Sequence, residues 1–336
     1  IPAGLGYVNT RVNYDVLTYL PEDIETMQGQ DILVDEFGTG AYSMFICEGM
    51  ENKDVAKLKE QIEDVEHVSK VVWYDSFADI SIPMEMLPED IREAFNADDS
   101  TLMFIIFDTT TSADETMDAI ENIRALAGKQ CFLSGMSAIV TDTKNLAESE
   151  VAIYVLIAVV LSCIVLALTM ESYLIPVFFL LSIGMAILYN MGTNIFMGQI
   201  SYITKALSAV LQLGVTMDYS IFLLDAFMNY RKQGMNEEDA IINAVQEAIN
   251  SIFASSLTTV VGFLALVTMK FSIGFDLGLV LAKGIVFSLL TVVFFMPAMI
   301  LKFAKLNERT KHKSFMPDFH GLGKVIYRIR PIVFAV

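Results

Sequence analysis

The sequence predicts an α-helical polytopic membrane bundle, preceded in the chain by a separate α+β domain. Charge is divided unevenly: residues 1–150 contain 9 Lys and Arg and 30 Asp and Glu, whereas residues 151–336 contain 13 and 10. Hydrophobic residues make up 54% of the chain and the mean hydropathy is +0.53, above the usual globular range. The boundary near residue 150 is therefore a change of solvent and of domain. The acidic first part argues against nucleic acid as a partner, because phosphate binding needs Lys and Arg.

Residues 1–150 alternate strand and helix signals. Strands are predicted at 41–49, 70–75, 101–108 and 131–135, and helices at 51–68, 88–95 and 112–128. A strand–helix–strand order that occurs twice is typical of a small α+β domain of ferredoxin-like type. No metal-ligand spacing and no nucleophile motif is visible in it, so we predict no cofactor, no metal site and no enzymatic activity.

The three cysteines do not form a disulfide framework. Cys163 lies in an apolar helix, and Cys47 and Cys131 lie in predicted strands. Those two could pair only if their strands lie close together, and buried free thiols are the favoured interpretation. The chain begins without Met and ends within a new apolar run, so it is expected to be a fragment cut at both ends.

The second part contains five runs long enough to cross a bilayer. Twenty helical residues at about 1.5 Å each span a hydrocarbon core of about 30 Å. We predict spans at about 151–170, 173–190, 204–229, 250–270 and 278–302, and the start of a sixth at 324–336. An amphipathic helix at 236–252, with Asn236 as its N-cap, is predicted to lie along the cytoplasmic membrane surface and to lead into the next span. A helix that serves only as a connector is the favoured interpretation.

The orientation follows from Lys and Arg in the loops. The segment 302–330 contains eight of these residues and 230–247 contains two, whereas 190–205 and 270–277 contain one each. The basic side is cytoplasmic, so the loop 303–323 is predicted to be cytoplasmic. Residues 1–150 are then extracytoplasmic.

Asp218 lies in the middle of the third predicted span, in the run GVTMDYSIF. A carboxylate near the bilayer midplane costs about 2.5–3.5 kcal/mol on insertion scales, so it is rarely kept without a use. A group that gains and loses a proton there is a natural part of an ion or proton pathway. We therefore predict that Asp218 binds the proton and that the Tyr219 hydroxyl helps to orient it. The alternatives are a structural Asp bonded to a neighbouring helix and an ordinary packed Tyr.

Three residues near Asp218 are candidates for supporting a proton path. Gly214 lies one turn earlier on the same helix face and would allow close helix approach. Asp225 lies two turns toward the cytoplasm and is either a proton exit or an interfacial charge. Lys283 lies within the fifth span and either snorkels to the interface or pairs with Asp218.

Ser256 and Thr259 belong to a hydroxyl cluster on the fourth predicted span. They could join a proton path. Such hydroxyls more often bond the backbone of their own helix or a neighbouring helix, and both interpretations stay open.

The layout and several of these runs resemble one half of an exporter of the RND superfamily, most closely its bacterial MMPL-like branch. Residues 211–234 resemble the fourth transmembrane helix of that branch and 255–266 its fifth, while Gly284, Ser288 and Pro297 suit its sixth. Residues 134–145 resemble the approach to its second helix. The resemblance implies two such halves, twelve helices and two porter domains, with Asp218 and Tyr219 on one side of a proton relay. The other side would come from the second half.

The resemblance implies an exporter of lipid-like or amphiphilic molecules, driven by the proton-motive force across the bacterial cytoplasmic membrane. Coupling to Na⁺ is the alternative to coupling to H⁺. The chain contains no Walker A pattern, which argues against ATP hydrolysis. Its expected partners are the lipid bilayer, a hydrophobic or amphiphilic substrate, the second half of the transporter and a possible homo-oligomer. The alternatives are a sterol-sensing type of lipid-binding domain and an accessory of protein secretion like SecD and SecF.

Overall fold

The computed structural model describes residues 2–37, 40–79, 82, 86–312 and 327. The chain divides into two compact units. One comprises Ile1–Ala152, Met191–Ser208 and Gly262–Leu281, and the other comprises Ile153–Asn190, Ala209–Val261 and Ala282–Val336. Each unit is described by itself below.

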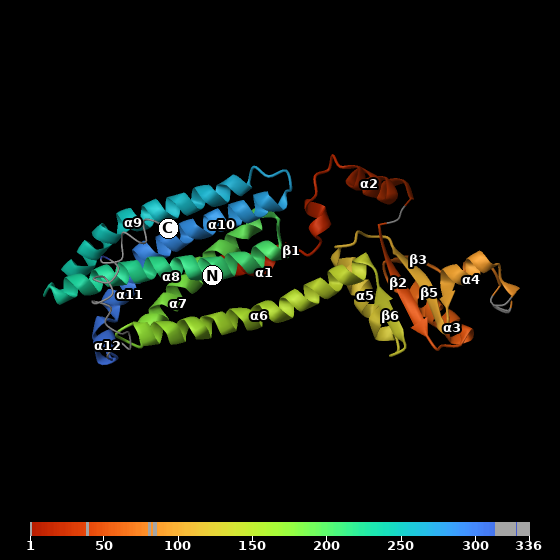
Figure 1. Cartoon of the computed structure of the whole chain (residues 1–336), viewed down its shortest axis with the longest axis horizontal. Helices are drawn as coiled ribbons and strands as arrows, with labels where there is room; N and C mark the ends of the chain where they lie inside the picture. The colour runs from red at the N-terminus through yellow and green to blue at the C-terminus, as the bar shows by residue number, and fades with distance from the viewer. Residues whose placement is uncertain (1, 38–39, 80–81, 83–85, 313–326, 328–336) are drawn as a thin grey trace. The chain divides into compact units, whose positions relative to one another are not determined.

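The first unit contains a five-stranded antiparallel sheet (Figure 1). Its strands are β2 (Ala41–Glu48), β3 (Val68–Val72), β4 (Asn96–Ala97), β5 (Ser100–Phe107) and β6 (Cys131–Ser134). The order is β3-β5-β2-β6, with β4 paired to β5. The helices that connect these strands are α3 (Asn52–Glu63), α4 (Glu89–Phe95) and α5 (Asp114–Leu126). Two strand–helix–strand units therefore share one sheet, in the order in which the sequence predicts them.

The core of this sheet contains fully buried aromatic side chains. Trp73 is completely buried, and its Nε1 donates a hydrogen bond of 2.7 Å to Oγ1 of Thr101 on β5. On α3, the apolar residues Val55, Leu58 and Ile62 are buried. The helix ends at Glu63, five residues before the predicted end at 68.

The two cysteines of the sheet lie opposite one another. Cys47 on β2 pairs in register with Cys131 on β6, and their Sγ atoms are 3.7 Å apart. Both thiols are free, as the favoured interpretation predicts. Burial, together with the neighbouring Cys131, raises the pKa of Cys47 to about 12.

Several elements of the first unit are not foreseen from the sequence. They are α1 (Pro2–Asn9), β1 (Arg11–Asn13), η1 (Val16–Tyr19), α2 (Glu25–Phe37), η2 (Tyr74–Ser76), η4 (Thr193–Met197) and β7 (Gln199–Ser201). Strand β1 pairs in parallel with β7, although the two are far apart in the chain. Gly6 and Gly192 bring α1 and the start of η4 into backbone contact, since a Cβ on either residue would overlap the other segment.

Among the residues that the structure describes, five helices are long and apolar enough to cross a membrane, in agreement with the five complete spans that the sequence predicts. They are α6 (Met136–Thr169), α7 (Ile175–Gly192), α8 (Tyr202–Lys232), α9 (Glu237–Leu266) and α10 (Ile273–Leu290). Helix α10 continues through a π-helical turn, η5 (Thr291–Phe295), into α11 (Met296–Lys302). Helix α6 begins before the predicted span, because residues 136–150 form helical turns that precede its apolar part.

The predicted helix at 236–252 is present and, as predicted, leads into the next span, with which it forms one continuous helix, α9, from Glu237 to Leu266. Its placement along the membrane surface stays a prediction. The buried residues of α9 recur on one face across the junction of the two predicted segments: Ala240, Ala244, Ala248, Ile252 and Ser256. This fourth-residue spacing matches one helix face, and no Gly or Pro interrupts it before Gly262. The predicted cap is present, since the backbone N–H of Asp239 donates to Oδ1 of Asn236 at 2.7 Å.

Part of the predicted basic loop at 303–323 forms a short helix, α12 (Ala304–Arg309). Residues 313–323 lie outside the described residues. The predicted start of a sixth span at 324–336 also lies outside them, apart from Tyr327.

Candidate functional site

Helix α8 has one exposed face within the second unit, and Asp218 lies on it. The exposed residues recur every third or fourth position: Leu211, Gly214, Asp218, Phe222, Asp225 and Asn229. This spacing places them in one stripe along the helix. No atom of another described segment lies within 4 Å of the Cβ position of Gly214. Within the described part of the chain, the Asp218 carboxylate makes no hydrogen bond and no ion pair.

Tyr219 points the other way. Its side chain is 6% exposed, and its hydroxyl lies beside Ser255 and Thr259 of α9. That hydroxyl makes no hydrogen bond of good geometry with the described residues. Asp218 and Tyr219 therefore face different surroundings, as their separation of about 100° around the helix predicts.

The two predicted hydroxyls of α9 bond their own helix. Ser256 is buried and its Oγ donates to a carbonyl oxygen one turn earlier at 3.0 Å. Oγ1 of Thr259 donates to the carbonyl oxygen of Ser255, also at 3.0 Å. These bonds are the structural alternative stated for both residues. A part in a proton path stays a prediction, and for Thr259 it is supported by the nearby Tyr219 hydroxyl.

Asp225 lies on the same exposed face as Asp218, two turns further along α8. Lys283 lies on α10 and is half-buried. No ion pair joins Lys283 to Asp218 among the described residues. The exposed face of α8 thus carries two carboxylates and no described counter-charge for Asp218.

The opposite face of α8 carries a buried polar cluster that sequence reasoning missed. Oε1 of Gln212 accepts a hydrogen bond from Nδ2 of Asn190 on α7 at 3.1 Å, and its Nε2 donates to the carbonyl oxygen of Gly284 on α10 at 3.0 Å. Asn190 and Gln212 are 0% and 2% exposed. A Cβ on Gly284 would lie 2.6 Å from Nδ2 of Asn190. The glycine therefore makes room for the amide pair.

The cluster continues one turn along α8. The hydroxyl oxygens of Thr216 and Ser288 lie 2.6 Å apart, and both residues are fully buried. The π-helical turn η5 begins three residues after Ser288. A sequence signal existed, because Gln212, Thr216 and Ser220 recur every fourth position in an apolar helix. A search for charged residues alone passes over it.

Sequence reasoning also missed a buried carboxylate, that of Asp276. The sequence placed it in a loop, whereas it lies in the first turn of α10 and is 4% exposed. Its Oδ2 accepts hydrogen bonds from the backbone N–H of Ser201 at 2.6 Å and from Oγ1 of Thr204 at 2.8 Å. Burial and the Asp276 charge both raise the pKa of Tyr19 nearby. The positive end of the helix also suits a carboxylate at this position.

The chain is similar to known membrane proteins over most of its length. The family model of the MMPL family matches residues 48–327. A protein of Methanocaldococcus jannaschii, named as a membrane protein, is 26% identical over 337 residues, which cover 89% of this chain and 87% of that relative. MmpL12 of Mycobacterium tuberculosis, named as a probable transport protein, is 28% identical over 208 residues.

The relatives differ greatly in length. The match to MmpL12 covers 58% of this chain and only 18% of the relative. The membrane protein YdfJ of Bacillus subtilis is 24% identical over 211 residues, which cover 61% of this chain and 29% of that relative. This chain therefore corresponds to a minor part of the longer relatives and to most of the archaeal one.

Proposed function

The chain belongs to the MMPL family, and from this premise we propose that it works in a secondary active exporter that moves lipid-like or amphiphilic molecules on the proton-motive force. It is a multi-pass membrane protein, since five helices in the described part of the chain are long and apolar enough to span a bilayer. The transport function named for one of its relatives supports the broader assignment as a membrane transporter. The cargo class and the coupling to protons belong to the proposal.

The observation that carries the proposal is the unpartnered carboxylate of Asp218. It lies halfway along a 31-residue apolar helix, on a face that no described segment covers. Left facing lipid, a charge at that depth would cost about 2.5–3.5 kcal/mol or more. We infer that a second set of membrane helices covers this face, from the same polypeptide or from a second copy. Gly214, one turn away, leaves space for close approach.

Proton exchange at such a buried interface gives a way to drive movement. When Asp218 binds a proton, its charge disappears, and the covering surface no longer has to stabilise it. The two protonation states then favour different arrangements of the interface, and the proton gradient shifts the population between them. Tyr219 lies behind this face and is proposed to transmit the change toward α9.

The sheet domain supports the exporter proposal. Its two strand–helix–strand units and antiparallel order β3-β5-β2-β6 support a ferredoxin-like, porter-type domain. The excess of Lys and Arg after α10 supports a cytoplasmic location for that end of the bundle. The sheet domain is then extracytoplasmic, where it is proposed to receive the cargo.

The test compares wild type with Asp218→Asn in liposomes that carry a pH gradient. The measurements are proton flux, followed with an enclosed pH dye, and gradient-dependent transfer of a fluorescent short-chain phospholipid to acceptor vesicles. We expect Asp218→Asn to insert normally and to lose both activities. The matched control is Asp118→Asn on the exposed side of α5, which should keep both.

Retained proton-coupled transfer in Asp218→Asn would refute the assignment of the proton site. Lipid binding without any gradient-dependent transfer in the wild type would refute export. That result would instead favour a lipid-sensing domain.

A further inference from the structure

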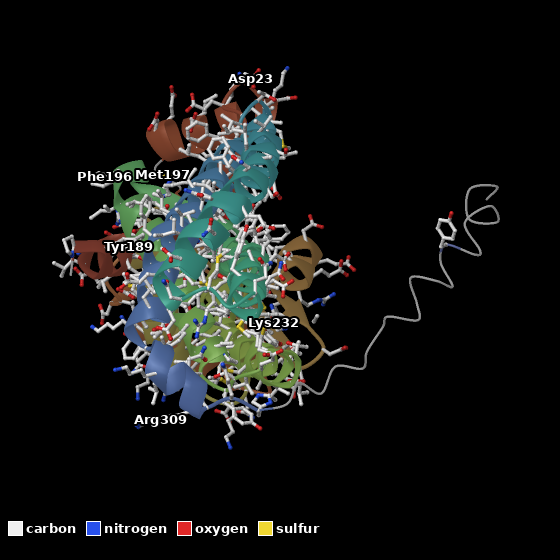
Figure 2. The ribbon with its side chains drawn as sticks, turned by 90° about the vertical axis from the view of Figure 1, so that its left-hand side faces the viewer. Asp23, Tyr189, Phe196, Met197, Lys232 and Arg309 are labelled. Carbon is white, nitrogen blue, oxygen red and sulfur yellow. The ribbon has the colours of Figure 1, made fainter. Side chains whose placement is uncertain are left out.

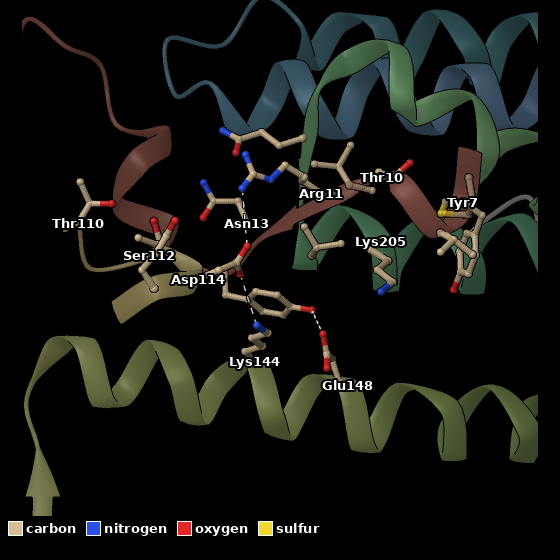
Figure 3. A pocket seen from close by; sticks show the side chains of 18 residues that line it. Tyr7, Thr10, Arg11, Asn13, Thr110, Ser112, Asp114, Lys144, Glu148 and Lys205 are labelled. Carbon is tan, nitrogen blue, oxygen red and sulfur yellow. Dashed lines mark hydrogen bonds and ion pairs between the residues drawn. The ribbon is translucent and has the colours of Figure 1, made fainter. Parts of the chain in front are cut away.

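The first unit contains a polar cavity of about 570 Å³ that the proposed proton site does not involve. It lies between the segment that follows α1, the first turn of α8, the polar turns of α6 and the loop that leads into α5 (Figure 3). Three cations, Arg11, Lys144 and Lys205, line it together with three carboxylates, Asp114, Glu115 and Glu148.

Two of the cations share one carboxylate. Nη2 of Arg11 lies 3.7 Å from Oδ2 of Asp114, and Nζ of Lys144 lies 3.6 Å from Oδ1 of the same residue. The Arg11 side chain is 79% exposed. Long, exposed ion pairs of this kind contribute little stability. Arg11 can therefore turn toward a ligand at little cost.

Another part of the cavity lining, Tyr14 and Glu148, is held in place by side-chain contacts. The hydroxyl of Tyr14 donates to Oε1 of Glu148 at 2.9 Å, and the Tyr14 ring stacks on Tyr202 with centroids 5.7 Å apart. Burial first, and then the Glu148 carboxylate, raise the pKa of Tyr14. The phenol therefore stays protonated and keeps Glu148 engaged at neutral pH.

Lys205 is different from both of the other cations. Its side chain reaches from α8 into the cavity (Figure 3), and its ammonium makes no ion pair with any residue that the structure describes. It is half-buried. The N–H groups of this ammonium are available to donate hydrogen bonds to an oxyanion.

The cavity lies where the helices change from polar to apolar. Glu148 lies three residues before the uncharged run 151–170, and Lys205 is the last charge on α8 before Asp218. Apolar residues complete the lining, among them Val12 and Ile200. Val8 of α1, which also lines the cavity, is 79% exposed. Charged donors beside apolar surface at this depth match an amphiphile rather than a fully polar solute.

We infer that this cavity binds the anionic, phosphate-type headgroup of an amphiphile, with the Lys205 ammonium and the Arg11 guanidinium on its oxygens. The apolar part of the ligand lies along α1 and the adjoining bilayer. Charge-assisted hydrogen bonds from these two side chains supply the selectivity for an anion. The inference names the substrate class of the proposed exporter and to that extent rests on the proposed function.

The test measures binding by calorimetry to the whole protein in nanodiscs, at low and at high salt. The probes are dihexanoyl phosphatidylglycerol below its micelle concentration, dihexanoyl phosphatidylcholine and inorganic phosphate. We expect the phosphatidylglycerol probe to bind most tightly. Lys205→Gln should weaken its binding roughly tenfold, and Lys205→Arg should preserve it, because one charge-assisted bond is lost in the first variant only. The control, Lys129→Gln, changes an exposed lysine outside the cavity and should bind normally.

Equal binding by wild type and Lys205→Gln would overturn the inference. Equal binding of inorganic phosphate and phosphatidylglycerol would overturn the amphiphile as ligand and leave a site for free phosphate. Asp218→Asn separates this inference from the proposed function: it should bind the probe like wild type while losing gradient-driven transfer. If that variant instead keeps transfer, the proposed proton site fails and the cavity assignment stands.

Discussion

Replacing Gln212 with Met tests whether the buried amide cluster holds α7, α8 and α10 together. Met has nearly the same length but removes two hydrogen bonds, from Asn190 at 3.1 Å and to the carbonyl oxygen of Gly284 at 3.0 Å. Hydrogen bonds between membrane helices contribute about 0.6 kcal/mol on average and at most about 1.7 kcal/mol. We therefore expect Gln212→Met to lower the free energy of unfolding by about 1–3 kcal/mol.

The assay is reversible unfolding in mixed micelles, with the helix content followed as the denaturing detergent is increased. The control is Leu211→Met, which changes a neighbouring residue on the exposed face of the same helix. That change should cost less than about 0.5 kcal/mol. A double-mutant cycle with Asn190→Leu should show coupling of about 0.5 kcal/mol or more, because the two amides bond each other. A Gln212→Met that unfolds like the control, or strictly additive energies, would refute the reasoning.

Two further predictions concern the sheet domain. Because the pKa of Cys47 is raised from 9.0 to about 12, the folded domain keeps a proton that the unfolded chain releases near pH 9. Its stability should therefore be full below pH 9 and should fall as the pH rises toward 12; the midpoint of thermal unfolding against pH measures this, and Cys47→Ser should flatten the slope. Trp73→Phe removes the hydrogen bond to Thr101 and should lower the free energy of unfolding of the domain, measured in urea, by about 1–3 kcal/mol. If the lost hydrogen bond contributes to this effect in addition to the lost burial of Trp73, adding Thr101→Val should restore part of the stability.

The sequence predicted the elements whose pattern is long and regular. Uncharged runs identified five membrane-length helices, and alternating signals identified the four main strands. Short elements such as β1 and β7 were missed, because three residues carry too little periodicity and the pairing joins distant parts of the chain. The helix at 236–252 and the span that follows it were predicted as two segments with different roles, because the composition changes from charged to apolar there, whereas the buried face of α9 continues across the change.

Only the charged residue at the centre of the candidate site could be predicted from the sequence. Asp218 was identified from its cost in a membrane, but its exposure could not be predicted, since that depends on which face of α8 the other helices cover. Asp276 was overlooked because its flanking sequence reads as a loop. Its burial depends on Ser201 and Thr204, which reach it from a distant segment.

The two faces of α8 have different consequences when Asp218 changes its charge. Gln212 and Thr216 tie the buried face to α7 and α10 through polar contacts that favour one rotation of the helix. Figure 1 shows these three helices, and Figure 2 labels Tyr189 on α7 and Lys232, the last residue of α8. Turning Asp218 inward would break those contacts and would bury its carboxylate inside the bundle. A movement of the covering surface relative to α8, at the exposed face that carries Asp218, costs less free energy. Neutralising Asp218 should therefore shift the contact across that face and leave the packing of this bundle nearly unchanged. Cysteine cross-linking measures both effects: the cross-linking yield from Phe222 on the exposed face should change, whereas the yield at a buried α8–α10 position should stay the same.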